Sequence, residues 1–213
     1  MKSFDSSLYF ITDSTGFEEE EFLHRVENAL KGGVSMLQLR EKERSTGEYI
    51  ALAVKVRDIA SMYNVPLIID DRADVAYAAD CAGVHVGQSD IPVDVARRIL
   101  GTDKIIGATA KTVEQALEAY RLGADYLGVG AIYPTTTKVK TVLTSVDTLR
   151  KICDAVPIPV NAIGGITKDN MDVLKGVDIA GICVVSAIMK ADSPETAASE
   201  LMEQFCTLKG IDI

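Results

Sequence analysis

The sequence predicts an α/β fold, a single closed (β/α)8 or TIM barrel, and three observations carry the prediction. Short apolar, β-branched segments alternate with longer amphipathic segments along the chain. Eight such apolar segments occur, and each is apolar on both alternating faces, as is typical of parallel strands covered on both sides. The 213 residues divided by eight give about 27 residues per unit, near the lower end of the size range of this fold.

The apolar segments are the expected strands, and they are bounded by loops rich in Gly, Asp and Thr. They cover residues 8–12, 36–40, 66–70, 83–87, 105–109, 126–130, 159–164 and 181–186. Because the segments between them are long enough to return to the start of the next strand, a parallel arrangement follows. An open doubly wound sheet is the alternative, but no GxGxxG motif follows the first strand, which counts against its dinucleotide-binding form.

The amphipathic segments are the expected helices. They cover residues 18–31, 46–63, 73–80, 93–100, 113–122, 145–155, 168–175 and 194–208. Candidate N-cap side chains precede or begin several of them, namely Thr46, Asp71, Thr112, Ser145, Thr167 and Ser193. Glycines follow several helix ends, where a left-handed backbone is favoured, at Gly32, Gly33, Gly101, Gly123 and Gly176.

Composition limits the class of protein. The formal net charge of −9 argues against binding nucleic acid through a broad basic face, although local cations could still bind anionic small molecules. No apolar run reaches the ~20 residues needed to cross a bilayer, and the N-terminus does not resemble a signal peptide. The four cysteines form no CxxC pair and there are only two histidines, so a zinc site is not expected. Without a signal peptide or membrane span, a soluble cytoplasmic protein with reduced thiols is expected. No linker interrupts residues 1–213, which predicts one domain.

A cationic cluster follows the second expected strand. Gln38, Arg40 and Lys42 have the same parity, so an extended chain points all three side chains to one side. In a parallel barrel the active site lies at the C-terminal ends of the strands, where these residues fall. Two cations and an amide there predict a clamp for an anion, although a single Arg at a strand end would more often be a solvated surface residue.

Carboxylates follow the next two strands. Asp70 and Asp71 end the third, and Asp90 follows the fourth. Hard oxygen ligands without His or Cys suit Mg²⁺, which usually retains waters and bridges to substrate phosphates. The alternatives are that Asp71 caps the next helix and that Asp90 is a turn residue before Pro92.

Phosphate-binding groups are expected after the later strands. Thr109 ends the fifth strand, and the loop after the sixth contains Thr135, Thr136, Thr137 and Lys138, which supply hydroxyl and ammonium donors. Gly165 follows the seventh strand, where such barrels frequently bind a phosphate. These positions predict one site for a pyrophosphate and another for a monophosphate. His85 lies within an apolar strand and is expected to be a structural residue rather than a general base.

Four short motifs occur in order along nearly the whole chain. They are Gln38-Leu39-Arg40-Glu41-Lys42, Gly83-Val84-His85-Val86-Gly87-Gln88-x-Asp90, Pro134-Thr135-Thr136-Thr137-Lys138 and Ile163-Gly164-Gly165-Ile166. Together they resemble the thiamine-phosphate synthase family. The resemblance implies a Mg²⁺-dependent coupling of hydroxymethylpyrimidine pyrophosphate with hydroxyethylthiazole phosphate, by loss of pyrophosphate and attack of the thiazole nitrogen on a pyrimidine carbocation.

The resemblance also implies residue roles. Gln38, Arg40 and Lys42 would hold the pyrimidine pyrophosphate, with Asp70 beside them, and Asp71 and Asp90 would bind Mg²⁺. Thr109 and Lys138 would contact the pyrophosphate, which makes them catalytic together with Arg40 and Lys42. The thiazole phosphate would be surrounded by Thr135, Thr136, Thr137, Gly165, Val185 and Ser186. The partners implied are these two small molecules, and a homodimer is left open.

Two segments depart from the family pattern, the end of the third strand and the loop after the fifth. Asp70 stands where the family usually has Asn, and this additional carboxylate could weaken pyrophosphate binding or alter the metal site. Thr109 and Lys111 stand where Ser and His are usual. A thiazole tautomerase and a non-catalytic thiamine-phosphate-binding protein are the alternatives. Lys111 in place of the tautomerase histidine, and retention of the cation clamp and both acids, disfavour the former.

Overall fold

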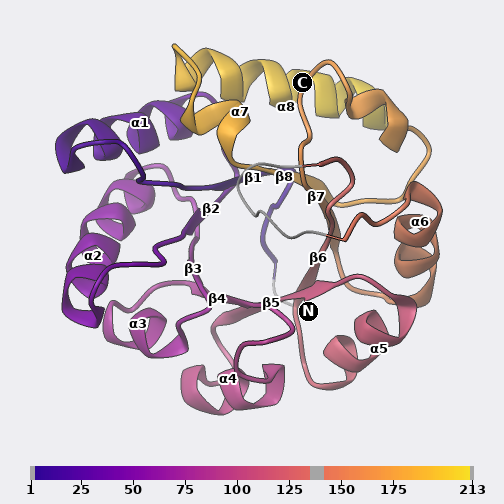
Figure 1. Cartoon of the computed structure of the whole chain (residues 1–213), viewed down its shortest axis with the longest axis horizontal. Coiled ribbons are helices and arrows are strands. Elements are labelled where there is room, and N and C mark those ends of the chain that lie inside the picture. Colours follow the sequence, from indigo (N-terminus) through magenta and orange to yellow (C-terminus); the bar gives the residue numbers. More distant parts are fainter. Residues whose placement is uncertain (1–2, 135–141, 212–213) are drawn as a thin grey trace.

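Eight parallel strands close into a barrel in the order β1 to β8 in the computed structural model, which describes residues 3–134 and 142–211. The strands are β1 Leu8–Ile11, β2 Met36–Leu39, β3 Leu67–Asp70, β4 Gly83–Val86, β5 Ile105–Ala110, β6 Tyr126–Gly130, β7 Val160–Ile163 and β8 Gly181–Val184. Helices surround this barrel on the outside (Figure 1). The predicted fold class is therefore confirmed, and all eight strands lie where they were expected.

The helices follow the strands in alternation. They are α1 Glu19–Lys31, α2 Thr46–Met62, α3 Ala73–Ala78, α4 Val93–Leu100, α5 Val113–Arg121, α6 Val146–Ala155, α7 Ser186–Met189 and α8 Pro194–Lys209, with a 3-10 helix η1 at Met171–Leu174. The predicted caps Thr112, Ser145 and Ser193 each accept a backbone N–H in the first turn. They satisfy donors that have no partner within the helix.

Three predicted caps are wrong, namely Thr46, Asp71 and Thr167. Thr46 is the first residue of α2, and Ser45 caps it in a reciprocal arrangement with Glu48. The spacing Ser-x-x-Glu decides between the two adjacent hydroxyl residues, because Glu48 also accepts the backbone N–H of Ser45. Arg72, not Asp71, is the residue before α3, and no side chain caps this helix. The Asp71 side chain instead faces Lys42.

The helix predicted over residues 168–175 is also wrong, since only η1 forms there. Asn170 accepts the backbone N–H of Thr167 and donates to the carbonyl of Gly165. This side chain folds residues 165–170 into a turn, so Thr167 caps no helix and only one 3-10 turn remains before Gly176. Conversely, α7 begins at Ser186 within the segment expected to be the end of the last strand.

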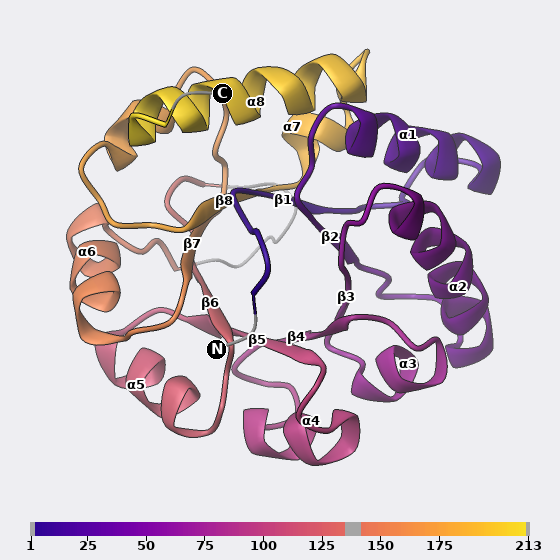
Figure 2. The same ribbon diagram turned by 180° about the vertical axis from the view of Figure 1, so that it is seen from behind.

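Two apolar clusters stabilise the barrel. The larger fills the space between the strands and the helices. The smaller lies inside the barrel and consists of Tyr9, Ile11, Met36, Ile68, Ile105, Tyr126 and Cys183. Residues before β1 cross the barrel opening that faces the viewer in Figure 2, and the Phe4 ring packs edge-on against Tyr126. This end is therefore covered.

Within residues 3–134 and 142–211, no helix has the length and apolar character needed to cross a membrane.

Glycine at position 107 makes room for Tyr126 inside the barrel. A Cβ atom at Gly107 would lie 2.1 Å from Cζ of the Tyr126 ring and 2.3 Å from its hydroxyl. We expect Gly107→Ala to lower the free energy of unfolding by about 2 kcal/mol because a close-packed interior must move to admit the methyl group. Urea unfolding measures this. Gly47→Ala in α2 is the control, since a Cβ there meets no atom within 4 Å beyond its chain neighbours and its own helix backbone. Equal stability of the two variants would contradict the prediction.

Candidate active site

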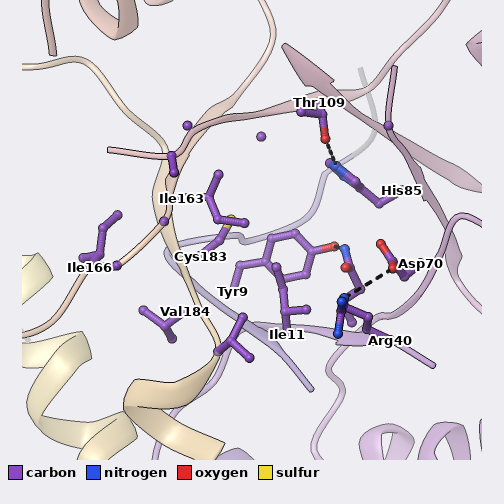
Figure 3. A pocket seen from close by; sticks show the side chains of 18 of the residues that line it. Tyr9, Ile11, Arg40, Asp70, His85, Thr109, Ile163, Ile166, Cys183 and Val184 are labelled. Atoms are coloured by element: carbon purple, nitrogen blue, oxygen red, sulfur yellow. Dashed lines mark hydrogen bonds and ion pairs between the residues drawn. The ribbon is translucent and has the colours of Figure 1, made fainter. Parts of the chain in front are cut away.

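A cavity of about 560 Å³ opens at the C-terminal ends of the strands. Its size is in the usual range for small-molecule sites. It is lined by most of the predicted site residues: Gln38, Arg40, Lys42, Asp70, Asp71, Asp90, Thr109, Gly165, Val185 and Ser186. Thr135, Thr136, Thr137 and Lys138 lie outside the described residues. The barrel thus brings residues from distant parts of the chain to one cavity (Figure 3).

Gln38 in β2, and Arg40 and Lys42 just after it, all line the cavity, as their shared parity predicts. Gln38 is buried inside the barrel and donates from Nε2 to the Tyr9 hydroxyl, at 2.6 Å. Arg40 Nε lies 3.8 Å from Asp70 Oδ2, the ion pair drawn in Figure 3. Lys42 Nζ lies 2.6 Å from the same oxygen and also donates to Asp71. Two cations therefore face the acidic side of the cavity.

Three carboxylates form that acidic side. Asp71 has a left-handed backbone with φ of 60°, and its N–H donates to the His85 carbonyl, at 2.8 Å. Asp90 Oδ2 accepts the N–H of Gly87, at 2.7 Å. Among the residues that the structure describes, no aligned hydrogen-bond donor meets the buried Asp70 Oδ2, although Lys42 Nζ lies 2.6 Å from it. Since an L-residue rarely adopts a positive φ, the surrounding structure holds Asp71 in place at an energetic cost.

The three acids have different proton affinities. Burial, and then the Asp71 charge, raise the pKa of Asp70 above its usual value. Burial and the hydrogen bond with Asp71 likewise raise the pKa of Asp90. Burial also acts on Asp71, but hydrogen bonds with Lys42 and Asp90 outweigh it and lower the pKa of Asp71. Asp71 is therefore the most strongly ionised of the three, and a cation bound beside it would relieve the repulsion of Asp90.

Replacing Asp70 with Asn tests the electrostatics of this cluster. The pKa of Asp70 is higher in the folded chain than in the unfolded chain. Between these two pKa values the folded state binds more protons, so the free energy of unfolding falls as the pH rises. Asp70→Asn should therefore be more stable than the parent at pH 7. The difference should shrink as the pH falls through the raised pKa and disappear below the ordinary pKa of an Asp side chain. Urea unfolding at a series of pH values measures both.

The control for this prediction has the opposite sign. The Arg72 hydrogen bond lowers the pKa of Asp74, whose ionised form therefore stabilises the folded chain at neutral pH. Asp74→Asn should thus be equally or less stable than the parent at pH 7. A less stable Asp70→Asn at pH 7 would show that the ion pairs with Lys42 and Arg40 outweigh burial.

The opposite side of the cavity is formed by backbone and small groups after β7 and β8. Gly164 and Gly165 both have positive φ, and a Cβ at Gly165 would lie 2.8 Å from the Pro134 carbonyl oxygen. A side chain at Gly165 would therefore be strained and crowded. Val185 and Ser186 lie where β8 passes into α7 and line the same cavity.

Several polar residues of the cavity were not singled out from the sequence. Tyr9 and Gln88 line it, and the Tyr126 hydroxyl lies beneath it, bonded to Tyr9 and His85. His85 lines the cavity and is hydrogen-bonded, which agrees with a structural role. The available signal was a tyrosine in an apolar strand, since a buried phenol needs a polar partner.

Comparison with known proteins decides the family. The family model described as "Thiamine monophosphate synthase" matches residues 8–188. The chain belongs to this family. The resemblance seen in the four motifs is thereby confirmed, and membership of the thiamine monophosphate synthase family makes the chain a transferase of thiamine biosynthesis.

Named relatives match this chain in sequence over almost its full length. "Thiamine-phosphate synthase 2" of Streptococcus pneumoniae is 50% identical over 197 residues, covering 92% of this chain and 94% of the relative. "Thiamine-phosphate synthase" of Methanobrevibacter smithii is 49% identical over 205 residues, covering 96% and 98%. The solved "Thiamine phosphate pyrophosphorylase" from Pyrococcus furiosus is 38% identical with a TM-score of 0.86, covering 95% of this chain and 96% of that one. These thiamine monophosphate synthase relatives do not favour the tautomerase alternative.

Proposed function

We propose that the chain joins 4-amino-2-methyl-5-hydroxymethylpyrimidine pyrophosphate to 4-methyl-5-(2-hydroxyethyl)thiazole phosphate, giving thiamine phosphate and pyrophosphate. Family membership supports the reaction. The structural observation that carries the proposal is one cavity with Arg40 and Lys42 beside the acids Asp71 and Asp90. Such a combination suits a departing pyrophosphate better than it suits a reaction that needs a strong base.

The pyrophosphate half of the site would be the side formed by β2 to β5. Arg40 and Lys42 would bind phosphate oxygens and stabilise the charge that develops as the bond to the pyrimidine carbon breaks. Thr109 would donate a hydrogen bond, and Gln38 and Asp70 would complete this half. Lys138, outside the described residues, is proposed as a further cation on the pyrophosphate.

Asp71 and Asp90 would hold Mg²⁺, and the donor set fits this ion. Their carboxyl groups are hydrogen-bonding neighbours at two adjacent strand ends, and their oxygens are hard ligands. Across the described ranges no group of three or more His, Cys, Asp or Glu side chains is arranged to hold a metal. Two carboxylates suffice for Mg²⁺, which keeps several waters and uses phosphate oxygens. The chemistry that the bound ion supplies is neutralisation of negative charge on those oxygens.

The thiazole phosphate would bind the opposite side, at Gly165, Val185 and Ser186, with Thr135, Thr136 and Thr137 proposed to complete it. The glycine allows a close approach of phosphate to the backbone. With both substrates in one cavity, the thiazole nitrogen would lie near the pyrimidine carbon when its pyrophosphate leaves. Exclusion of water would protect the resulting carbocation until the nitrogen attacks it.

The test is direct formation of thiamine phosphate. The purified protein is incubated with both substrates and Mg²⁺, and the products are separated by chromatography. We expect one pyrophosphate released for each thiamine phosphate formed, and no product when either substrate or Mg²⁺ is omitted. Folded protein that binds both substrates without forming product would support the non-catalytic alternative instead.

Three predictions from the sequence remain proposals, and they concern the number of domains, the cellular location and the oligomeric state. We propose that residues 1–213 form one domain, since the described barrel uses strands from Leu8 to Val184. A cytoplasmic location and a homodimer also stay proposals. Size-exclusion chromatography with light scattering measures the oligomeric state.

A further inference from the structure

A chain of hydrogen bonds crosses the barrel interior beneath the cavity. Gln38 Nε2 lies 2.6 Å from the Tyr9 hydroxyl, which lies 2.7 Å from the Tyr126 hydroxyl. The Tyr126 hydroxyl lies 3.0 Å from His85 Nδ1, and His85 Nε2 lies 3.0 Å from Thr109 Oγ1. The last contact is drawn in Figure 3, where Thr109 and His85 point toward each other. Five side chains from five strands are thus connected in series, and the series ends at the cavity wall.

The first member gives this series a direction. An amide nitrogen can only donate, so the Tyr9 oxygen accepts from Gln38. Both phenols keep their protons, because burial raises the pKa of Tyr9 and the pKa of Tyr126 well above the usual value. Within the described part of the chain the Tyr9 hydroxyl contacts only Gln38 and Tyr126, so its one hydrogen goes to Tyr126, and Tyr126 gives its own hydrogen to His85 Nδ1. That ring nitrogen must then be the unprotonated one.

We infer that this series holds His85 as the Nε2–H tautomer and so aims the Thr109 hydroxyl hydrogen into the cavity. His85 Nε2 donates to Thr109 Oγ1 and occupies the oxygen as an acceptor. The Thr109 hydroxyl then has its own hydrogen to give to an anionic oxygen. Tyr9, Tyr126 and His85 are positioning residues in this arrangement. The identity of the anion as pyrophosphate rests on the proposed function.

The other protonation states conflict with the geometry. With hydrogen on Nδ1, His85 would donate to Tyr126, Tyr126 to Tyr9, and the Tyr9 hydrogen would face the Gln38 Nε2 donor at 2.6 Å. A doubly protonated ring would leave the Tyr126 hydroxyl with donors on both sides and no acceptor for its hydrogen. Both leave a buried donor without an acceptor, which proteins avoid. With Gln38 Nε2 facing Tyr9, the Nε2–H tautomer of His85 is the state that gives each hydrogen between Gln38 and Thr109 an acceptor.

The first experiment reads the tautomer without substrate. The chain has only two histidines, and the other, His24, contacts Asn28 on α1. In ¹⁵N-labelled His24→Gln protein, the ring signals therefore belong to His85. At neutral pH we expect Nε2 to show a directly bonded hydrogen and Nδ1 the shift of an unprotonated nitrogen. A dominant Nδ1–H or doubly protonated ring would overturn the inference. The readout needs no turnover, so it is separate from any failure of the proposed reaction.

The second experiment removes one member of the series. Tyr126→Phe deletes the hydroxyl that donates to Nδ1, so His85 should become a mixture of tautomers. The matched control is Tyr63→Phe, which deletes a phenol bonded to Glu27 on the helix surface and should leave the tautomer unchanged. An unchanged tautomer in folded Tyr126→Phe would overturn the inference.

The third experiment measures what the series does for binding. Isothermal titration of pyrophosphate with Mg²⁺ should show affinity lowered about tenfold by Thr109→Val, equivalent to one hydrogen bond to a charged group, and nearly unchanged by Thr109→Ser. Tyr126→Phe, which leaves the Thr109 hydroxyl in place but disorders its hydrogen, should fall between them. Full affinity in Thr109→Val would overturn the donor role. Loss of affinity in Thr109→Ser would overturn it too, since the hydroxyl is retained.

Discussion

Asp90→Asn is expected to lower turnover at limiting Mg²⁺ by about 100-fold, a loss comparable to removal of one preorganised electrostatic group from an active site. Asp90 Oδ2 accepts the Gly87 N–H and fixes the loop, and the Asp90 carboxyl group is also a hydrogen-bonding neighbour of Asp71. An amide keeps the size of the side chain but lacks the charge that a divalent cation requires. The measurement is the initial rate of thiamine phosphate formation over a Mg²⁺ titration.

The variant should recover part of its rate at high Mg²⁺, because Asp71 is retained and only affinity for the ion is weakened. Asp94→Asn is the control, since Asp94 is a partly exposed residue of α4 that pairs with Arg98 along the same helix and does not line the cavity. It should behave as the parent at every Mg²⁺ concentration. A parent-like Mg²⁺ dependence in Asp90→Asn would remove Asp90 from the metal site.

Lys42→Met is expected to lower the catalytic efficiency by 100-fold or more, on the order of the loss seen when a charge-stabilising group is removed. The Lys42 ammonium contacts both Asp70 and Asp71, and their charges raise the pKa of Lys42 despite its partial burial. Lys42 is thus charged at neutral pH. Without it the acids would repel an incoming pyrophosphate more strongly, because Arg40 would be the remaining described cation paired with Asp70.

Steady-state kinetics in the pyrimidine pyrophosphate and calorimetric titration of pyrophosphate should both show this loss. Methionine keeps an unbranched chain of similar length, so the change removes charge with little change of shape. Lys55→Met is the control, because Lys55 pairs with Glu19 on the outer helices. If Lys42→Met bound pyrophosphate as tightly as the parent, the lysine would serve only to neutralise Asp70 and Asp71.

The barrel was predictable because its signals are local and repeated. Each strand, from Leu8–Ile11 to Gly181–Val184, is a short apolar run, and the helices between them begin behind recognisable caps such as Thr112 and Ser145. The prediction of a helix over residues 168–175 was wrong because hydrogen bonds from a side chain to the backbone stabilise a turn there instead. Asn170 bonds both Thr167 and Gly165, which no periodicity reveals.

Residue types and strand-end positions determined much of the candidate site. Gln38, Arg40 and Lys42 share a parity, and the acids Asp71 and Asp90 end neighbouring strands, so both sets line one cavity as expected. The roles assigned to them stay predictions until the variants are measured. The sequence could not show that Asp71 is not a helix cap, because a left-handed φ at an Asp is set by its surroundings.

Sequence by itself determined the closed barrel, the family and the side chains that meet at the strand ends. Those features follow from periodicity, chain order and motif spacing, which are properties of the chain. Only the tertiary structure decided that Lys42 lies between Asp70 and Asp71, and that Tyr9, Tyr126 and His85 connect Gln38 to Thr109. Hydrogen-bond direction and proton affinity depend on which groups are neighbours across the barrel and how deeply they are buried. Closure of the barrel sets both.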